Sequence, residues 1–203
     1  MSRWQPNARE RLADAALELF VEQGFASTTV PEITARAGLT TRTFFRHFAD
    51  KREVLFDSGD SLPALARRII AEAPPELSPI AVIAGGLDTV ASEQFGGDIE
   101  HFRTRRAVIH ADESLREREL RKMSALSEAI SHGFRQRGLD ELRATLVAHV
   151  TATVFSVAIG RWLDEDKPAP LSELLHDTLA VLRSVLDDLD ASGSKAQARA
   201  DSR

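Results

Sequence analysis

The sequence predicts an all-α fold, in which an N-terminal three-helix helix-turn-helix domain is followed by a larger helical bundle. Apolar residues recur three or four positions apart through most of the chain, and no segment alternates apolar and polar residues between hairpin turns. Near residue 38 a short glycine-containing turn separates two short helical segments, as in a helix-turn-helix. The 203 residues are enough to bury a sizeable core.

The first two predicted helices have clear start and stop signals. Residues 7–23 carry apolar side chains at helical spacing, with Asn7 as the N-cap and a glycine as the stop. Thr28 or Thr29 caps the second helix, which runs to about residue 37. Pro31 lies in its first turn, where a missing N–H is tolerated.

The stretch GLTTRTFFRHF, residues 38–48, predicts a third short helix with two chemically different faces. Phe44, Phe45 and Phe48 fall within about 100° of one another, and we expect them to pack in the core. The other side is short, basic and rich in hydrogen-bond donors, which suits a phosphate backbone. Its side chains are those of Arg42, Thr43, Arg46 and His47.

A longer helix is predicted from Lys51 to about residue 73, with Pro63 inside it. An interior proline removes a backbone hydrogen bond, so we expect this helix to kink or split there. Further helices are expected near 78–95, 99–110, 114–137, 140–165 and 171–189. The domains are therefore expected at 1–50 and 51–190, with 191–203 as a disordered tail because its hydrophobicity is low.

The composition argues against several kinds of site. The chain contains no cysteine, which excludes disulfides, thiolate catalysis and cysteine zinc sites. The six histidines lack metal-ligand spacing, and neither a nucleophile elbow nor a glycine-rich phosphate loop occurs. We therefore expect that the protein is not an enzyme and uses no metal or cofactor.

The hydrophobic segments favour a cytoplasmic protein that does not enter a membrane. The N-terminus MSRWQPNARE has no apolar run, so no signal peptide is expected. The most apolar run, residues 144–160, is interrupted by His149 and by several threonines and serines, whereas a membrane span needs about 20 mainly apolar residues. We expect a helix that is buried on most sides.

The net charge of −5 by itself argues against nucleic acid, but the charges are unevenly distributed. Residues 1–55 hold eight Arg and Lys against seven Asp and Glu, and the rest of the chain holds 18 against 24. A near-neutral head on an acidic body can still bind DNA if its cations share one face.

The residues from Phe20 to Leu55 fit the pattern F-x-x-x-G-F-x-x-T-T-V-x-x-I-x-x-x-A-G-L-T-x-x-T-F-F-x-H-F-x-x-K-x-x-L. This pattern resembles the DNA-binding region of TetR-type transcriptional regulators. The later stretch FRTRRAVIHADESLREREL resembles the regulators of mycofactocin and acyl-CoA type. The resemblance implies that the first three helices bind the major groove. It also implies a C-terminal domain that carries a ligand pocket and dimerises through its last two helices.

The resemblance also implies individual DNA contacts, each of which has an alternative. Arg42 stands where the family more often has a small residue, and an arginine can pair with guanine O6 and N7; a solvated arginine is the alternative. Lys51 matches a lysine that commonly clamps the phosphate backbone. The alternative is a generic surface lysine. Phe45 stands where the family usually has a tyrosine whose hydroxyl reaches phosphate, so that contact is lost here. The candidate DNA-binding residues are Thr29, Thr40, Thr41, Arg42, Thr43, Phe45, Arg46, His47 and Lys51, with helix capping as the other role open to the threonines.

Polar residues inside apolar patterns mark the candidate ligand pocket, because a pocket between bundle helices needs apolar walls and a few placed polar groups. His149 lies in the most apolar run, where a satisfied core histidine is the alternative. Gly85-Gly86 inside a helix indicates either close packing or room for a ligand. Clustered arginines suit an acidic ligand or, alternatively, surface ion pairs. The candidate ligand-binding residues are Phe95, Phe102, Arg105, His110, Phe134, His149 and Phe155.

The last two predicted helices, 140–165 and 171–189, are the expected homodimer interface. The stretch LSELLHDTLAVLRSVLDDL has leucines and valines at helical spacing in a stripe broad enough to pack a partner. The helix before it is apolar on more sides than one bundle needs. We therefore expect a symmetric contact of four helices between two protomers. The alternative is that these helices pack only within one protomer.

These inferences predict a ligand-responsive DNA-binding transcriptional regulator. In this hypothesis a dimeric repressor is released from a palindromic operator in double-stranded DNA when an unidentified small molecule binds its C-terminal domain. The alternative is a DNA-binding dimer without a small-molecule effector, regulated by a protein partner or by its abundance. That alternative predicts a filled core in place of a pocket.

Overall fold

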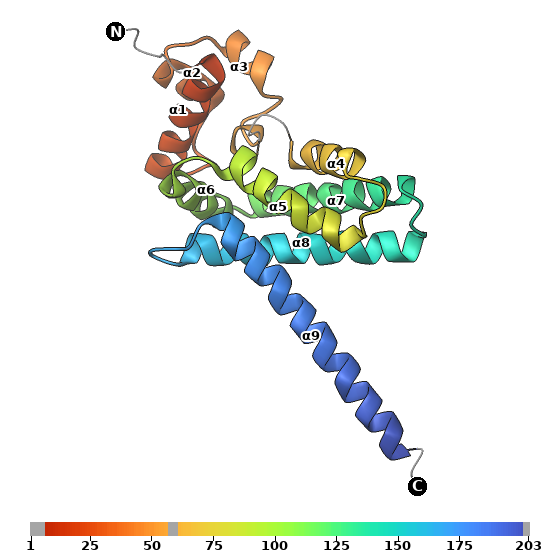
Figure 1. The fold of residues 1–203 in the computed structure, drawn as a ribbon. Coiled ribbons are helices and arrows are strands. Elements are labelled where there is room, and N and C mark those ends of the chain that lie inside the picture. The colour runs from red at the N-terminus through yellow and green to blue at the C-terminus, as the bar shows by residue number, and fades with distance from the viewer. Residues whose placement is uncertain (1–6, 57–60, 201–203) are drawn as a thin grey trace, which may run out of the picture. The chain divides into compact units, whose positions relative to one another are not determined.

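The computed structural model describes residues 7–56 and 61–200, and their side chains as far as residue 187. Within these ranges every regular element is helical, so the predicted all-α fold is confirmed (Figure 1). The elements are α1 (Ala8–Gln23), α2 (Val30–Arg36), α3 (Thr41–His47), the 3-10 helix η1 (Glu53–Leu55), α4 (Leu62–Glu72), α5 (Pro79–Phe95), α6 (Ile99–Ala111), α7 (Glu113–Gln136), α8 (Glu141–Asp164) and α9 (Leu171–Ala200).

The chain packs as two compact units. The first, here called the head unit, contains α1, α2, α3, η1 and α6, together with α7 as far as residue 125. The second, the body unit, contains α4, α5, the rest of α7, α8 and α9. This division differs from the predicted boundary at residue 50, because α6 and the first half of α7 pack with the head. Such long-range packing leaves no mark in the local sequence.

Local capping explains why the head forms three short helices. The Asn7 side chain accepts from the backbone of Glu10, whose carboxylate accepts from Asn7 in return, and this capping box starts α1. Thr29 and Glu32 form the same arrangement at the start of α2. Gly38, with φ of +63°, turns the chain between α2 and α3, a conformation that glycine adopts without strain.

The head core is built around side chains from five α-helices. Leu12 of α1, Ile33 of α2 and Phe44 of α3 are each fully buried, as is Leu115 of α7. Val108 and Ile109 of α6 join the same cluster. The helix-turn-helix is therefore packed against a further helix pair, α6 and α7, within its own unit.

The helix expected from Lys51 to residue 73, with a kink or split at Pro63, is not a single α-helix among the described residues. The described residues show one turn of 3-10 helix, η1, and then α4, which begins at Leu62. Pro63 is the second residue of α4 and does not lie in a helix interior. In a first turn the missing N–H of proline has no intrahelical partner to lose, so the residue starts a helix there instead of kinking one.

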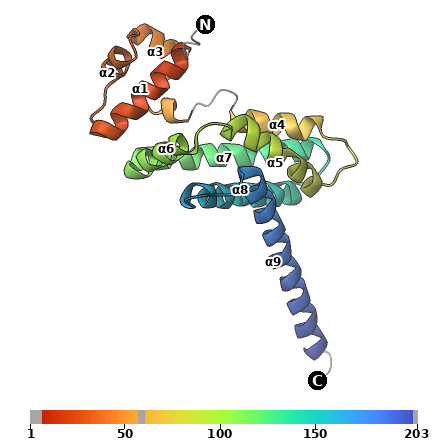
Figure 2. The same cartoon turned by 60° about the vertical axis from the view of Figure 1, so that its left-hand side comes forward.

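The body unit packs α5 against α4, α8 and α9, and α8 against α9 (Figure 2). Arg137 follows α7 and donates to the carbonyl oxygens of Ile70, Ala73 and Pro74 at 2.6–3.2 Å, which satisfies acceptors left free at the end of α4. The last helix was expected to end near 189, before a disordered tail. Instead α9 continues to Ala200, and its C-terminal half extends beyond the other helices of its unit in both views.

The helix α8 is buried on one face only, which corrects the expectation that it is buried on most sides. Its buried residues include Ala144, Ala148, Val154 and Ala158. Among the described residues it is the one helix long and apolar enough to cross a membrane, and 22% of its most apolar window is buried. Its exposed face mixes large apolar side chains, those of Leu142, Leu146 and Val157, with polar ones such as His149 and Thr153.

Candidate functional site

The outward face of α3 is a shallow, polar and cationic surface, here called the α3 surface. Phe44 and Phe48 face inward and are 0% and 2% exposed, as predicted. Phe45 was expected in the core as well, but it is 57% exposed, because a seven-residue helix turns only one narrow face inward. The residues that line the hollow on this surface are Thr40, Arg42, Thr43, Phe45 and Arg46.

The threonines of the α3 surface are held by local hydrogen bonds. The Thr40 hydroxyl oxygen accepts from the backbone N–H of Thr43 at 3.1 Å, and the two hydroxyl oxygens are 2.9 Å apart. Thr29 caps α2 through Glu32. Thr41 begins α3 and is exposed. The capping role that the sequence left open is thus present at Thr29 and Thr40, and both side chains remain exposed.

The cations of the α3 surface have no acidic partner among the described residues. Arg42 and Arg46 are exposed, and one Arg46 guanidinium nitrogen lies 3.5 Å from the His47 ring nitrogen Nε2. The acids of the head are engaged elsewhere: Glu18 and Glu22 with Arg36, and Glu32 in its capping box. Positive charge is therefore concentrated on this face despite the near-neutral balance of the head.

The Lys51 side chain points into the head, whereas the sequence suggested that it clamps the DNA phosphate backbone. Its ammonium group donates to the carbonyl oxygens of Phe25, Ala26 and Thr28 at 2.7, 3.3 and 2.8 Å, and lies 4.3 Å from the centre of the Phe25 ring. Burial lowers the pKa of this ammonium group from its ordinary value. All three N–H donors are used, so Lys51 holds the loop between α1 and α2 in place.

A second charged cluster joins the segment after α3 to α7 within the head unit. The Glu53 carboxylate accepts from Lys122 at 2.6 Å and from Arg118, and a guanidinium nitrogen of Arg118 lies 3.6 Å from Asp50. Burial alone would raise the pKa of the Glu53 carboxyl, but the hydrogen bonds from Lys122 and Arg118 outweigh it and hold the pKa below its ordinary value. Sequence reasoning did not find this cluster, because its members are 65 or more residues apart.

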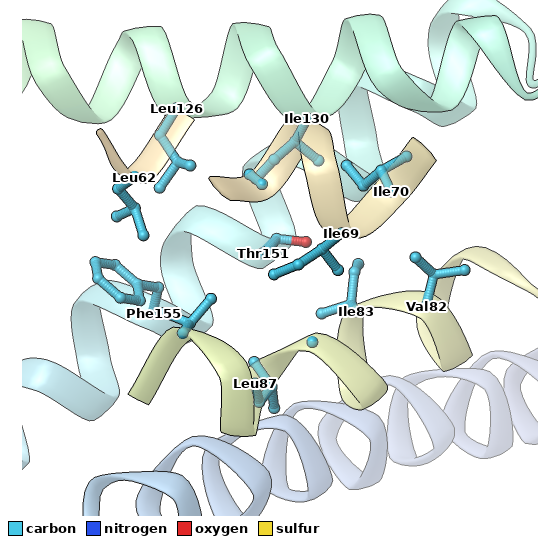
Figure 3. Close-up of a pocket in the computed structure, with 13 residues that line it drawn as sticks. Leu62, Ile69, Ile70, Val82, Ile83, Leu87, Leu126, Ile130, Thr151 and Phe155 are labelled. Atoms are coloured by element: carbon cyan, nitrogen blue, oxygen red, sulfur yellow. The ribbon is translucent and has the colours of Figure 1, made fainter. Parts of the chain in front are cut away.

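The body unit contains an apolar cavity of about 60 Å³, partly open to solvent, between four helices (Figure 3). Its one polar side chain is that of Thr151, whose hydroxyl donates to the Val147 carbonyl at 2.7 Å and so has no donor left for a ligand. The lining residues are Leu62, Ala66, Ile69 and Ile70 of α4, Val82, Ile83, Gly86, Leu87 and Val90 of α5, Leu126 and Ile130 of α7, and Thr151 and Phe155 of α8.

The two adjacent glycines of α5 have different environments. A Cβ atom on Gly86 would meet Cγ2 of Ile69 at 2.7 Å, closer than side-chain atoms pack, so Gly86 allows the close approach of α4 and α5 at the cavity. A Cβ atom on Gly85 would meet nothing within 4 Å. The close packing that the sequence left open therefore applies to Gly86, which also lines the cavity.

The structure separates the candidate ligand-binding residues. Phe155 lines the cavity, and its ring centre is 5.8 Å from that of Phe95. Phe134 is fully buried in the body core away from the cavity lining, and His149 is exposed, which corrects the expectation that it faces a pocket or core. The other three candidates, Phe102, Arg105 and His110, belong to the head unit.

Ion pairs, the simpler alternative, engage at least three of the six clustered arginines, including Arg118 with Glu53. Arg103 pairs with Glu100, Arg121 with Glu117, and His110 lies 4.0 Å from Glu119. Most wall residues were missed because they are ordinary aliphatic side chains at core spacing. Gly86, a glycine inside an apolar helix, was the one available signal.

Family profiles match both parts of the chain. Residues 12–57 match the profile described as "Bacterial regulatory proteins, tetR family", and residues 77–187 match the "MftR C-terminal domain". The second match alone covers more than half of the chain.

Curated relatives agree with these profiles. The HTH-type transcriptional regulator TcmR of Streptomyces glaucescens is 33% identical over 92 residues, which are 45% of this chain and 41% of TcmR, so the match spans less than half of that relative. MftR of Mycobacterium tuberculosis, whose name gives it as a candidate mycofactocin biosynthesis transcriptional regulator, is 22% identical over 193 residues, which are 94% of this chain and 96% of MftR.

Solved structures share the fold. The transcriptional regulator FadR from Bacillus subtilis, in complex with stearoyl-CoA, has a TM-score of 0.53 at 17% identity, covering 85% of this chain and 96% of FadR. A complex of SmeT with triclosan has a TM-score of 0.54 at 20% identity, covering 87% of this chain and 91% of SmeT. At these identities the likeness concerns the fold alone.

Proposed function

The chain belongs to the TetR family of bacterial regulatory proteins, and from that premise we propose that it is a dimeric repressor released from a palindromic DNA operator by a small molecule. The α3 surface carries this proposal. It presents hydroxyl and guanidinium groups that no acid of the described head neutralises. A cytoplasmic location and the absence of an enzymatic activity are parts of the same proposal.

In this proposal α3 enters the major groove and Arg42 reads a base. Arg42 is exposed at the front of α3, and a bidentate pair with guanine is the commonest specific contact of arginine. Thr41, Thr43 and Arg46 contact phosphates on either side. Lys51 is left out of the contact set, because its donors are used inside the head.

The dimer is proposed to form through α8 and α9. Both helices keep large apolar side chains exposed, and monomeric soluble proteins rarely leave such stripes uncovered. A symmetric contact of the two helices from each protomer would cover them and present two α3 surfaces to a palindrome. The exposed residues are Leu142, Leu146 and Val157 of α8, and Val181, Val185 and Leu186 of α9.

The effector is proposed to bind at the cavity of the body unit. The walls are apolar and come from four helices, so an occupant would separate α4, α5, α7 and α8 from one another. FadR and SmeT bind stearoyl-CoA and triclosan, and both ligands are largely apolar in the part that a bundle can enclose. The aliphatic lining of this chain's cavity favours an apolar moiety.

We place the coupling between effector and DNA on α7. Leu126 and Ile130 of α7 line the cavity, and Lys122 and Arg118, one and two turns earlier, hold Glu53 just after α3. Lys122 and Leu126 are four residues apart and so lie on the same side of the helix. An occupant that shifts α7 thereby shifts the anchor of the segment that follows α3.

Selection of bound sequences from random duplex DNA tests the DNA-binding part. The wild type is compared with Arg42→Ala and with the matched control Arg135→Ala, an exposed arginine of α7 in the body unit. A palindromic site, with relaxed preference at one base pair in Arg42→Ala alone, is the expected result. Failure of a folded dimer to enrich any site would contradict the proposal.

A further inference from the structure

A surface groove lies beside the cavity in the body unit, on the next face of α5. It is lined by Asp88, Thr89, Ala91, Ser92 and Phe95 of α5, Trp162 of α8, and Pro170, Leu171 and Ser172 at the start of α9. On α5, Leu87 and Val90 line the cavity. Asp88, Thr89, Ala91, Ser92 and Phe95 of the same helix line the groove.

An aromatic ladder separates the cavity from the groove. The Phe95 ring centre is 5.8 Å from that of Phe155, which lines the cavity, and 6.0 Å from that of Trp162, which lines the groove. Phe155 and Trp162 are seven residues apart on α8 and so share a face. A change of rotamer at Phe95 or Phe155 would therefore join the two spaces.

The cavity by itself cannot hold a complete effector. Its volume of about 60 Å³ is small beside ligand pockets, which typically run to about 300–1,000 Å³. It also offers no charged side chain and no free hydrogen-bond donor, since the Thr151 hydroxyl donates to Val147, and burying a charged group without a charged partner is costly. An effector that enters it must therefore place its polar end elsewhere.

The groove offers a ligand one negatively charged partner, the carboxylate of Asp88. Asp88 contributes a carboxylate whose side chain is 71% exposed, and Phe95 and Trp162 supply aromatic rings that attract cations. His176 lies 3.3 Å from one oxygen of this carboxylate, which leaves acceptor sites for a second donor. The lining contains no lysine or arginine, and Asp88 is its one charged side chain.

We propose that the effector is an amphipathic cation, whose apolar chain occupies the cavity and whose amine lies against Asp88 and Trp162 in the groove. This inference rests on the proposed ligand-responsive function and specifies its ligand class. A ligand with phosphates at its polar end is disfavoured in this arrangement, because the phosphates would meet the Asp88 carboxylate.

Four probes with the same ten-carbon chain test the proposal: decylamine, 1-decanol, decanoate and decanoyl-CoA, all kept below micellar concentration. The protein has two tryptophans, so Trp4→Phe leaves Trp162 as the reporter of groove binding. Dissociation constants come from Trp162 fluorescence, and release of the selected operator is measured in parallel. Asp88→Asn removes the carboxylate, and Asp177→Asn, an exposed aspartate outside the groove lining, is the matched control.

Decylamine is expected to bind most tightly and to release the operator. Asp88→Asn should weaken decylamine by about threefold to fivefold and leave 1-decanol unchanged, because a partly exposed ion pair contributes that much. Asp177→Asn should change neither. Tighter binding of decanoate or decanoyl-CoA, or equal losses in the two variants, would overturn the inference while leaving a ligand-responsive regulator. If no probe binds to a protein that still selects an operator, the effector site itself is wrong.

Discussion

The α3 surface and the cavity of the body unit acquire their geometry in opposite ways. The α3 surface is shaped by bonds between residues three apart, such as Thr40 with Thr43 and Thr29 with Glu32. The cavity is shaped by four helices whose lining residues run from Leu62 to Phe155. The first site is held by short-range contacts and stays exposed. The second depends on how whole helices pack, so an occupant can alter it.

The contrast indicates that the surface proposed to read DNA is rigid, whereas the cavity proposed to bind the effector can change its shape. A surface that reads DNA needs fixed side chains, because specificity depends on hydrogen bonds of defined geometry. A control site needs walls that can move, and aliphatic side chains around a small void can repack at modest cost. The charged cluster at Glu53 connects the two properties, since α7 carries residues of both.

The largest expected effect comes from the two adjacent phenylalanines of α3. Phe44→Ala removes a fully buried ring, and the free energy of unfolding should fall by about 3–5 kcal/mol. Phe45→Ala removes a ring that is mostly exposed, and the same free energy should change by less than about 1 kcal/mol. Urea unfolding followed by circular dichroism measures both. Equal losses would show that Phe45 packs in the core, as its sequence pattern predicted.

Breaking the Glu53 cluster is expected to come next. Glu53→Gln leaves the partly buried Lys122 without a carboxylate and Arg118 with Asp50 alone, and unfolding should become easier by about 1–3 kcal/mol. Operator release by an effector should also need a higher concentration, because α7 loses its anchor after α3. Glu117→Gln breaks an exposed pair with Arg121 and is the control. If Glu53→Gln needs the same effector concentration as the wild type for operator release, α7 does not couple the effector site to DNA binding.

The same cluster predicts a pH dependence of stability. The folded-state pKa of Glu53 lies below its ordinary value of 4.5, so the folded state favours the ionised carboxylate. The stabilisation is therefore complete above about pH 5 and is lost as the pH falls through the lowered folded-state pKa. Unfolding of wild type and Glu53→Gln between pH 7 and pH 3 measures it. The difference between the two proteins should shrink on acidification, and a constant difference would exclude this carboxylate as the cause.

The adjacent glycines of α5 test whether the walls of the cavity can move. Gly86→Ala places a Cβ atom against Ile69, and we expect a loss of about 1–2 kcal/mol in the free energy of unfolding and weaker binding of any cavity ligand. Gly85→Ala meets open space in an exposed helix position and should gain about 0.5–1 kcal/mol. Thermal unfolding and ligand titration report both. A gain in both variants would mean that Ile69 moves aside freely.

The sequence predicted most of what local signals determine. The three helices of the head, their asparagine and threonine caps and the glycine turn were all readable, because each depends on residues close in sequence. Phe45 was misassigned for a geometric reason: three phenylalanines within a 100° arc do not all fit the one narrow face that a short helix buries.

The cavity could not be predicted, because its walls are aliphatic residues that look like any core. Polar and aromatic residues at unusual positions drew the sequence interpretation toward His149 and Phe134, which are exposed and fully buried respectively. Only Phe155 of that set lines the cavity. Pro63 was placed in a helix interior for a similar reason, since helical spacing alone does not show where a proline begins a new helix.

The smallest expected effect distinguishes two roles for Lys51. If its three carbonyl contacts define its role, Lys51→Met should lower the free energy of unfolding by about 1 kcal/mol and leave the salt dependence of operator binding unchanged. A phosphate clamp would instead reduce the slope of log K against log salt by about one unit per lysine. Arg46→Met, on the α3 surface, is the matched variant that should reduce that slope. Equal slopes for wild type and Lys51→Met, with a reduced slope for Arg46→Met, would assign the lysine to the loop between α1 and α2 and the phosphate contact to α3.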